Sequence, residues 1–567
     1  MDQNEQRPKR NGDVRPENSG KSTQTVKHVK LDLERPKLTK EGNADQGRKR
    51  PRSRKRSFDS SKKDRGATLK IIPLGGLDAI GKNMTVFECK GDMVLDDAGL
   101  MFPDDNHPGV DLILPDYTYV LQHADKLRGI VITHGHEDHT GSLPYLIKDL
   151  DRQVPIYGTK MTLGLIEGKF KEHRIKNAKL DQTPIDGVHT DFGALARFAE
   201  EGVDLMMSDS TNATNPNFTP SEAEVGKELQ RIIAQAKGRV IIASFASHIH
   251  RLQQICDAAV ANGRKVVVTG RSMVQNTDIA RKLGYLKISD QDIIEAYDLK
   301  GIPPEQVVIM CTGSQGEPLS ALARIAAGEH KTIDMEAGDT VIISATPVPG
   351  NEKAVTKVVN SLAKIGADVY DKSRARVHVS GHASAEELKI MLTIVQPKAF
   401  MPVHGEATHL RAHARLAEAV GVPAENVFIC ENGESLELST KGVKHGEFVQ
   451  SGIVLVDGLS VGDTSEQVLE ERTALSAQGF AAIAAAVSGR KKAVAGNVQV
   501  EMHGITGGDD GYLVQECEKC VKNALTRALS KGASGKELKK AARDALLSLL
   551  WERTKTRPMT VVNLLDI

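Results

Sequence analysis

Gly129-Ile-Val-Ile-Thr-His-Gly-His-Glu-Asp-His139 joins a short apolar run to a cluster of side chains that bind metals. The β-branched start of this stretch predicts a buried strand that delivers His134 at its C-terminal end. A transition-metal site needs imidazoles and carboxylates that converge to within about 2.0–2.2 Å of the ion. His134 and His136 can reach one ion, while Asp138 and His139 on the following turn can serve a second. Four potential ligands in six residues make a solvated polar turn a poor explanation of this stretch.

The residues around this stretch predict strands first, and then alternating strands and helices. Three short runs before it predict strands, at 69–74, 84–89 and 93–97. After residue 204, β-branched runs each precede a helical pattern, which predicts a parallel sheet covered by helices. These runs are Val240–Ala243, Lys265–Val268, Val307–Met310 and Thr340–Ile343. Residues 452–567 form a third unit, with strand-like runs at 453–456 and 560–565 and a long amphipathic stretch at 535–551.

The length and composition favour a globular protein of several domains. At 567 residues the chain exceeds what one hydrophobic core holds, about 250–300 residues, so we expect two or three domains. No apolar run approaches the roughly 18 residues of a membrane span, and the N-terminus lacks the apolar segment of a signal peptide. We therefore expect a cytoplasmic protein with no membrane partner. The six cysteines are few and scattered, which suits a reducing compartment, and the lone CxxC at Cys517 and Cys520 is interpreted as structural or incidental.

The first 66 residues differ sharply in charge from the rest of the chain. They hold 20 Lys and Arg against 10 Asp and Glu, while the remainder is net acidic. With almost no aromatic residues, such a segment cannot bury enough surface to offset its ordering entropy, so we expect it to be disordered. A basic arm on a mildly acidic body indicates either RNA contact or a merely solvated tail.

Further motifs give the chain a family resemblance. The HxHxDH pattern at residues 134–139 is the signature of the metallo-β-lactamase superfamily. The later motifs, in chain order, are Asp209-Ser-Thr-Asn-Ala213, Phe245-Ala-Ser-His-Ile-His-Arg-Leu-Gln-Gln254, Gly270-Arg-Ser-Met273, Cys311-Thr-Gly-Ser-Gln-Gly-Glu-Pro318, Thr346-Pro-Val-Pro-Gly-Asn-Glu352, His378-Val-Ser-Gly-His382 and Met401-Pro-Val-His-Gly-Glu406. As an ordered set they resemble the ribonuclease J family of the β-CASP group, from about Leu69 to the C-terminus with one gap.

The resemblance implies an α/β fold of several parts. We expect a metallo-β-lactamase αββα sandwich with an inserted β-CASP α/β domain and a C-terminal α+β domain. The implied boundaries are the basic arm at 1–66, the lactamase domain at 67–208 and 376–447, the β-CASP domain at 209–375 and the C-terminal domain at 448–567.

The resemblance also implies roles for individual residues. Asp97 is similar to the family's upstream acid, which orients a ligand histidine, although the residue could also be a simple strand-end acid. Asp209 lies in the acid motif and is expected to be catalytic, as is His382, a candidate proton donor near the scissile phosphate. The expected metal ligands are His134 and His136 for one ion, and Asp138, His139 and His404 for the other.

Two segments are implied to contact RNA. The first consists of His378, Val379, Ser380, Gly381 and His382, and the second of Ala246, Ser247 and His248. The small Ser380 and Gly381 of the first segment would let a phosphate approach backbone N–H donors. The alternative is that His378, His382 and His404 are only polar strand-end residues, but their glycine-flanked context favours a function. The remaining candidates, His173, His189, His409 and His413, are interpreted as surface histidines.

Between the HxHxDH motif and the acid motif, the sequence departs from the family. There the family supplies two more ligands, a histidine in an H-S-I-P-like segment and a metal-bridging aspartate in a G-D-F-K-like segment. This chain passes almost directly from His173-Arg-Ile175 to Lys179-Leu-Asp-Gln-Thr-Pro184, where the family places several dozen residues. Asn177 then stands where the bridging aspartate belongs, and a neutral amide cannot bridge two cations as a carboxylate does. His189 lies beyond the junction and is a poor substitute.

Three hypotheses follow. The first is a zinc-dependent ribonuclease with 5′–3′ exonuclease and endonuclease activity in RNA decay and processing, including that of ribosomal RNA. The second is an RNA-binding remnant without turnover, because two ligands are missing. The third is a different hydrolase on the same scaffold, against which the β-CASP motifs argue. The implied partners are RNA, further copies of the chain in a dimer or tetramer joined through the C-terminal domain, and other RNA-decay proteins. The family binds two Zn²⁺ per subunit, and we expect fewer here.

Overall fold

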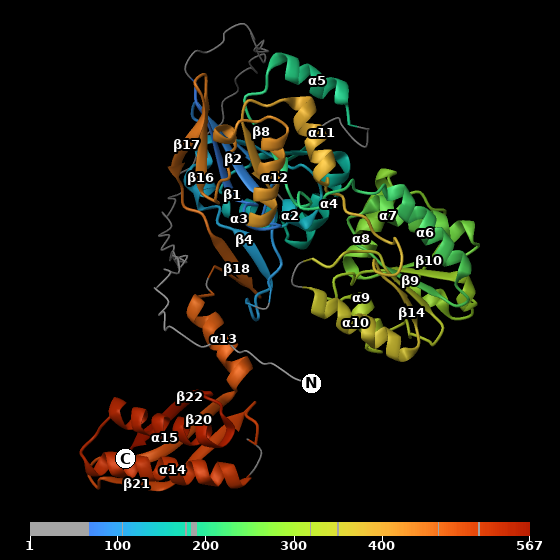
Figure 1. The fold of residues 1–567 in the computed structure, drawn as a ribbon. Coiled ribbons are helices and arrows are strands. Elements are labelled where there is room, and N and C mark those ends of the chain that lie inside the picture. The colour runs from blue at the N-terminus through green and yellow to red at the C-terminus, as the bar shows by residue number, and fades with distance from the viewer. Residues whose placement is uncertain are drawn as a thin grey trace, which may run out of the picture. The chain divides into compact units, whose positions relative to one another are not determined.

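The computed structural model describes residues 67–104, 106–175, 179–182, 190–317, 319–348, 351–462, 464–507 and 511–567 (Figure 1). The basic arm at 1–66 lies outside the described residues, and so do Asn177 and His189. Within the described ranges, every helix is too short or too polar to cross a membrane.

The main sheet of the lactamase part combines the two ends of that part. Its strand order is β17-β16-β1-β2-β3-β5-β6-β7, antiparallel from β17 to β3 and parallel from β3 to β7. β1 therefore pairs with β16 although hundreds of residues separate them in the chain (Figure 1). The strands are β1 (Leu69–Gly75), β2 (Met84–Cys89), β3 (Asp92–Asp96), β5 (Leu127–Val131), β6 (Pro155–Gly158), β7 (Lys179–Gln182), β16 (Glu434–Ser439) and β17 (Gly442–Phe448).

Short helices cover one face of this sheet. Alternate residues of β2 and β3 are buried, and they pack with β1 and with the apolar faces of these helices in one core that includes Ile72, Val86 and Leu146. The helical elements are α1 (Thr118–Gln122), η1 (Ala124–Lys126), α2 (Glu137–Thr140), α3 (Leu143–Asp149) and α4 (Lys160–Glu172).

A second, smaller sheet faces the other side. β8 (Met206–Asp209) and β15 (Phe400–Val403) pair in parallel, and they are the only strands of this sheet within the described residues. Met401 of β15 packs against Ile71 and Leu436 of the main sheet. On the outer side lie α5 (Phe192–Glu201), α11 (Ala385–Val395), α12 (Ala407–Ala419) and η4 (Ala424–Asn426). These layers confirm the expected αββα sandwich.

The β-CASP part is a fully parallel sheet, as the β-branched runs predicted. Its order is β11-β10-β12-β9-β13-β14, with buried cores on both faces. The strands are β9 (Val240–Ala243), β10 (Lys265–Thr269), β11 (Ile293–Ile294), β12 (Val307–Cys311), β13 (Thr340–Ile343) and β14 (Asp368–Tyr370). The helical elements are α6 (Glu222–Gln235), α7 (Ile249–Ala261), α8 (Arg271–Leu283), η2 (Ala296–Leu299), η3 (Pro304–Gln306), α9 (Ala321–Ala326) and α10 (Glu352–Ile365).

The C-terminal part has a core of its own. Cys517 is buried in that core, in agreement with a structural role for the CxxC pair. The sheet has the order β21-β20-β22 and packs against two long helices. The elements are α13 (Glu466–Gln478), β20 (Phe480–Ser488), β21 (Ala493–His503), α14 (Gly511–Ser530), α15 (Lys536–Thr554) and β22 (Met559–Asp566).

Two segments pack differently from the boundaries implied by sequence. β18 (Ile453–Asp457) was assigned to the C-terminal domain, but it pairs with β4 (Leu112–Pro115) and with β19 (Ser460–Val461), and Val456 joins the lactamase core. Val377 and Val379, assigned to the lactamase domain, are buried in the β-CASP core. The reason is burial: each segment carries apolar side chains that only the neighbouring core can cover. We propose boundaries near Glu466 and Ser380.

Candidate metal centre

The HxHxDH motif runs from the loop after β5 into the short helix α2. Asp138 and His139 are on that helix, and His136 is its N-cap residue. The loop after β3 anchors this helix through its backbone. Ala98 N–H donates to His139 O, and Leu100 N–H donates to Glu137 O. A side chain at Gly99 would overlap Asp138 O, so this close approach requires glycine. The strand end and the loop together fix where the ligand side chains start.

Asp97 orients His139 from the side opposite the candidate metal position. The Asp97 carboxylate lies 2.6 Å from His139 Nδ1 and also accepts from Thr133 N–H at 2.9 Å. Asp97 is buried and has a φ of 59°, a strained conformation for a residue with a side chain. With Nδ1 bound to a carboxylate, His139 presents Nε2 for a metal, the usual arrangement of metal-binding histidines.

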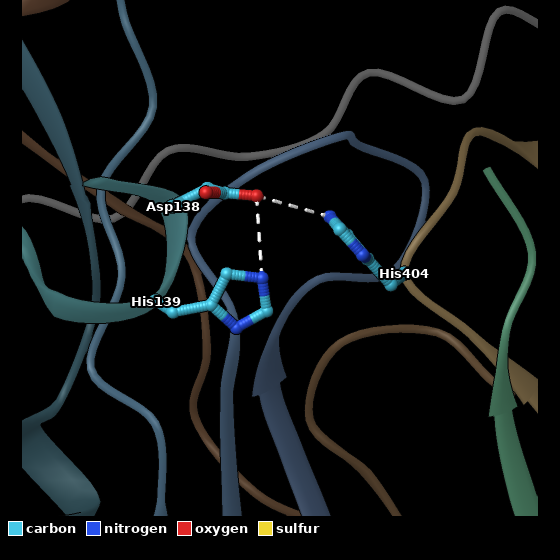
Figure 2. A group of neighbouring side chains, drawn as sticks. All are labelled: Asp138, His139 and His404. Carbon is cyan, nitrogen blue, oxygen red and sulfur yellow. Dashed lines mark ion pairs between the residues drawn. The ribbon is translucent and has the colours of Figure 1, made fainter. Parts of the chain in front are cut away.

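Asp138, His139 and His404 converge on one point, as Figure 2 shows. Asp138 Oδ2 lies 3.3 Å from His139 Nε2 and 3.3 Å from His404 Nε2. His404 Nε2 is buried, and its 3.3 Å contact with the Asp138 carboxylate does not have hydrogen-bond geometry, so the atom stays available to a ligand. Two imidazoles and a carboxylate with room for a further ligand fit a catalytic zinc ion.

Asp209 has the same relation to His404 that Asp97 has to His139. It ends β8, directly beside the end of β15, so parallel pairing brings the two residues together. Asp209 Oδ1 lies 3.0 Å from His404 Nδ1, and its Oδ2 lies 3.1 Å from His382 Nδ1. One carboxylate therefore orients both a candidate ligand and the candidate proton donor.

The electrostatics of the cluster favour a cation. Although burial opposes it, the imidazoles of His139 and His404 beside Asp138 hold the pKa of that carboxyl far below its usual range. Burial would lower the pKa of His139, but Asp138 and Asp97 outweigh it and raise the pKa of that imidazole to about 10. Carboxylates thus dominate the local field, and the same field would stabilise a bound metal ion.

His134 and His136 lie side by side without such a partner. His134 Nε2 is 3.2 Å from His136 Nδ1. Burial, followed by the neighbouring His139 and His136, lowers the pKa of His134 to about 3. In the part of the chain that the structure describes, no group of three metal-binding side chains includes either residue. Two ligands are marginal for zinc, so this half of the expected site is incomplete.

The expected RNA-contacting segments divide into buried and open positions. Gly381 has open space where a side chain would stand, and His382 is about one-third exposed. Val379, expected to contact phosphate, has its side chain in the β-CASP core, so only its backbone can face a ligand. Burial and then Arg251 lower the pKa values of both His378 and His248 to about 4. Ala246 packs against the same core.

Ser247 lines a cavity of about 680 Å³ whose polar wall carries both basic side chains and the acidic Glu137 and Glu172. Lys169, Arg271, Arg324 and His330 are among its other lining residues, and Gly135 of the HxHxDH motif is at its edge. The cavity therefore adjoins the candidate metal centre and offers cations to a phosphate chain.

Sequence reasoning missed Asn83 and misplaced His413. Asn83 Nδ2 donates to Asp138 O at 3.0 Å and lies 3.4 Å from His139 Nε2. Its only sequence signal is the Gly81-Lys-Asn83 loop, which does not point to α2. His413 was expected on the surface, but it is fully buried, with Nδ1 3.1 Å from Ser210 Oγ. The buried face of α12 covers the second sheet and places it there. His173 and His409 are half-buried.

Family models match most of the described chain. They are "Ribonuclease J, beta-CASP domain" at residues 237–362, "Ribonuclease J C-terminal domain" at 467–567, "Zn-dependent metallo-hydrolase RNA specificity domain" at 367–430 and "Beta-lactamase superfamily domain" at 107–223. The match to the third of these supports a metal cofactor and RNA as substrate.

Curated relatives extend the likeness to nearly the whole length. Ribonuclease J of Mycolicibacterium smegmatis is 40% identical over 88% of this chain and 97% of its own. Ribonuclease J2 of Bacillus subtilis is 37% identical over 89% of this chain and 100% of its own. Ribonuclease J of Thermus thermophilus is 40% identical over 74% of this chain and 82% of its own.

The alignment lengths agree with a missing segment. The alignment with the M. smegmatis relative runs over 546 positions, whereas 88% of this 567-residue chain is only about 499 residues. About 47 aligned positions of the relative therefore have no counterpart here, which matches the several dozen residues expected to be absent. Apart from that segment, motifs, fold and relatives agree, and the chain belongs to the ribonuclease J family.

Proposed function

We propose that this chain is a metal-dependent ribonuclease that hydrolyses RNA phosphodiester bonds, exonucleolytically from the 5′ end and endonucleolytically. The observation that carries the proposal is the convergence of Asp138, His139 and the buried Nε2 atom of His404 on one point. Family membership and the RNA-specificity match support RNA as the substrate. The remnant hypothesis is not favoured, because one complete ligand set survives.

The surrounding residues have separable tasks in this reaction. A bound metal ion would lower the pKa of a coordinated water and neutralise charge on the scissile phosphate. Asp97 and Asp209 hold the two ligand imidazoles by their Nδ1 atoms. Asp209 also accepts from His382 Nδ1, which leaves His382 Nε2 to carry the proton for the leaving oxygen.

RNA would reach this centre along the cavity beside Gly135. Arg271 and Arg324 can neutralise backbone phosphates near the scissile one, while Lys169 is paired with Glu137 at 2.8 Å. The open position at Gly381 would let a phosphate approach backbone N–H groups next to His382. Contacts of this kind are independent of base identity, as expected for an enzyme of RNA decay.

We propose zinc as the metal, with one tightly bound ion in the hydrolytic centre. Mixed nitrogen and oxygen ligands suit zinc, and among the described residues the Asp138–His139–His404 set is the group of three that contains residues of the HxHxDH motif. Metal analysis of the purified protein should find about one zinc per chain that is lost in His404→Ala. A further zinc ion that is lost in His134→Ala would show that the His134–His136 half is completed by other residues.

A digestion assay tests the activity directly. RNA labelled at either end and carrying a 5′ monophosphate should be degraded from the 5′ end, and a chelator should abolish this. His382→Ala should slow the maximal rate by about a hundredfold while leaving zinc content unchanged. RNA binding without any metal-dependent cleavage would restore the remnant hypothesis.

We also propose self-association through the C-terminal part. β22 is an edge strand with Val561, Leu565 and Ile567 exposed. An exposed apolar edge favours pairing with another chain. Light scattering should give a dimer or tetramer, and Val561→Lys should shift it toward monomer.

A further inference from the structure

Cys430, Glu434 and His445 form a second cluster of metal-binding side chains. Cys430 lies in the loop before β16, Glu434 begins β16, and His445 is on β17. The pairing of β16 and β17 shifts register here, since Glu434 faces Phe448 while Leu436 faces His445. Such a bulge re-aims side chains, and here it leaves His445 beside Glu434.

The three side chains are close together and held in place. Their ligand atoms all lie within 4.8 Å of one another, and His445 Nδ1 is 2.6 Å from Glu434 Oε1. Glu434 Oε2 accepts from Glu431 N–H at 3.2 Å, and the ring of Phe428 packs edge-on against His445. Cys430 is buried at 2% exposure, whereas the His445 side chain is half exposed, so an ion could enter from the solvent side.

The chemistry of the set is that of a zinc-class ion. Thiolate, imidazole and carboxylate together match the ligands that structural and catalytic zinc sites use. With no metal, burial and the Glu434 charge raise the pKa of the Cys430 thiol to about 12. A coordinated cation reverses this preference and deprotonates the thiol.

We propose that Cys430, Glu434 and His445 bind a second, structural metal ion of the zinc class, separate from the hydrolytic centre. Asn432 lies between Cys430 and Glu434 in the chain. Its Oδ1 accepts from Leu77 N–H at 3.2 Å, and its Nδ2 donates to Leu77 O at 2.7 Å. Leu77 in turn bridges to Gly405, the neighbour of His404. A metal at Cys430 would therefore steady the loop that supports the position of His404.

Cobalt substitution distinguishes this site from the hydrolytic one, because Asp138, His139 and His404 offer no sulfur. The full-length protein, reduced and free of oxygen, is titrated with Co²⁺ alone and followed by near-ultraviolet absorption. We expect a sulfur-to-cobalt charge-transfer band that saturates at about one equivalent. The band should persist in His404→Ala and in the double variant Cys517→Ser, Cys520→Ser, and should vanish in Cys430→Ser.

A second variant guards against misfolding of Cys430→Ser. His445→Gln changes a half-exposed residue and should weaken cobalt binding, read from the same band, by at least about tenfold. The matched control is His107→Gln, since His107 makes a similar ion pair with Asp104 but has no cysteine partner in the described structure. The control should leave the band unchanged. Absence of the band in the parent protein, its survival in Cys430→Ser, or undiminished affinity in His445→Gln would each overturn the proposal.

Discussion

The two halves of the HxHxDH motif differ in the further ligands that the fold brings to them. Asp138 and His139 gain His404 from the loop directly after β15 and two orienting carboxylates. His134 and His136 lie equally close to each other but gain no third ligand from any described residue. Both halves come from the same six residues, so the difference arises entirely from what distant segments bring to them. A local motif supplies ligands, and the rest of the fold completes a site.

The largest effect is expected when the complete half is broken. Asp138→Asn removes the shared carboxylate between two imidazoles and should reduce RNA cleavage on the order of a thousandfold, with loss of bound zinc. His134→Ala should cost less than about tenfold, since no described residue completes a ligand set for its half. Equal losses in the two variants, measured as initial rates under matched RNA concentrations, would mean that both halves act together.

Restoring the missing segment should sharpen the comparison. The aligned residues absent from this chain can be inserted between Lys176 and Lys179 from the M. smegmatis relative. The insertion should raise zinc content by about one ion per chain and increase cleavage by about a hundredfold, because paired ions share the activation of water. A length-matched insertion whose histidine and aspartate are replaced by alanine is the control. A gain from that control would assign the effect to folding.

A smaller effect is expected from loosening one orienting contact. Asp97→Asn keeps the shape of the side chain but loses the charge that holds His139 Nδ1. Zinc affinity should fall by about 10–100-fold. Competition against a calibrated chelator measures this, and added zinc should recover much of the activity. If saturating zinc restores nothing, Asp97 acts on the reaction and not through the ligand.

The smallest effect is expected at His413, which lies in the helix layer behind the strand that leads to His404. Burial lowers the pKa of His413 to about 4, below the ordinary value of 6.5, so the unfolded chain binds the proton first. The free energy of unfolding should therefore decrease as the pH falls from about 6.5 to about 4, with a contribution from His413 of about 3 kcal/mol at most. Urea unfolding at several pH values should show a shallower dependence in His413→Gln than in the parent.

The matched control for that experiment is His250→Gln, because His250 is exposed on α7. This variant should keep the pH dependence of the parent. An unchanged slope in His413→Gln would mean that His413 is protonated in the fold or solvated during the measurement.

Local patterns predicted a large part of the fold. The strands at β1, β2 and β5, the parallel β-CASP strands and the long helix α15 all follow from the spacing of apolar residues along a few turns or pleats. Burial of His413, the contact of Asn83 with α2 and the pairing of β18 with β4 were not predicted. Each depends on partners far away in the chain, and nothing in the local sequence names those partners.

The sequence alone determined the family, the order of the domains and the candidate ligands of the motif, because these depend on residue types at short spacings. The tertiary structure decided which ligands meet. Asp209 and His404 face each other only because β8 and β15 pair in parallel, and Cys430, Glu434 and His445 meet only because a bulge shifts one strand against another. Coordination requires convergence within a few ångströms, and backbone pairing between distant segments is what provides it.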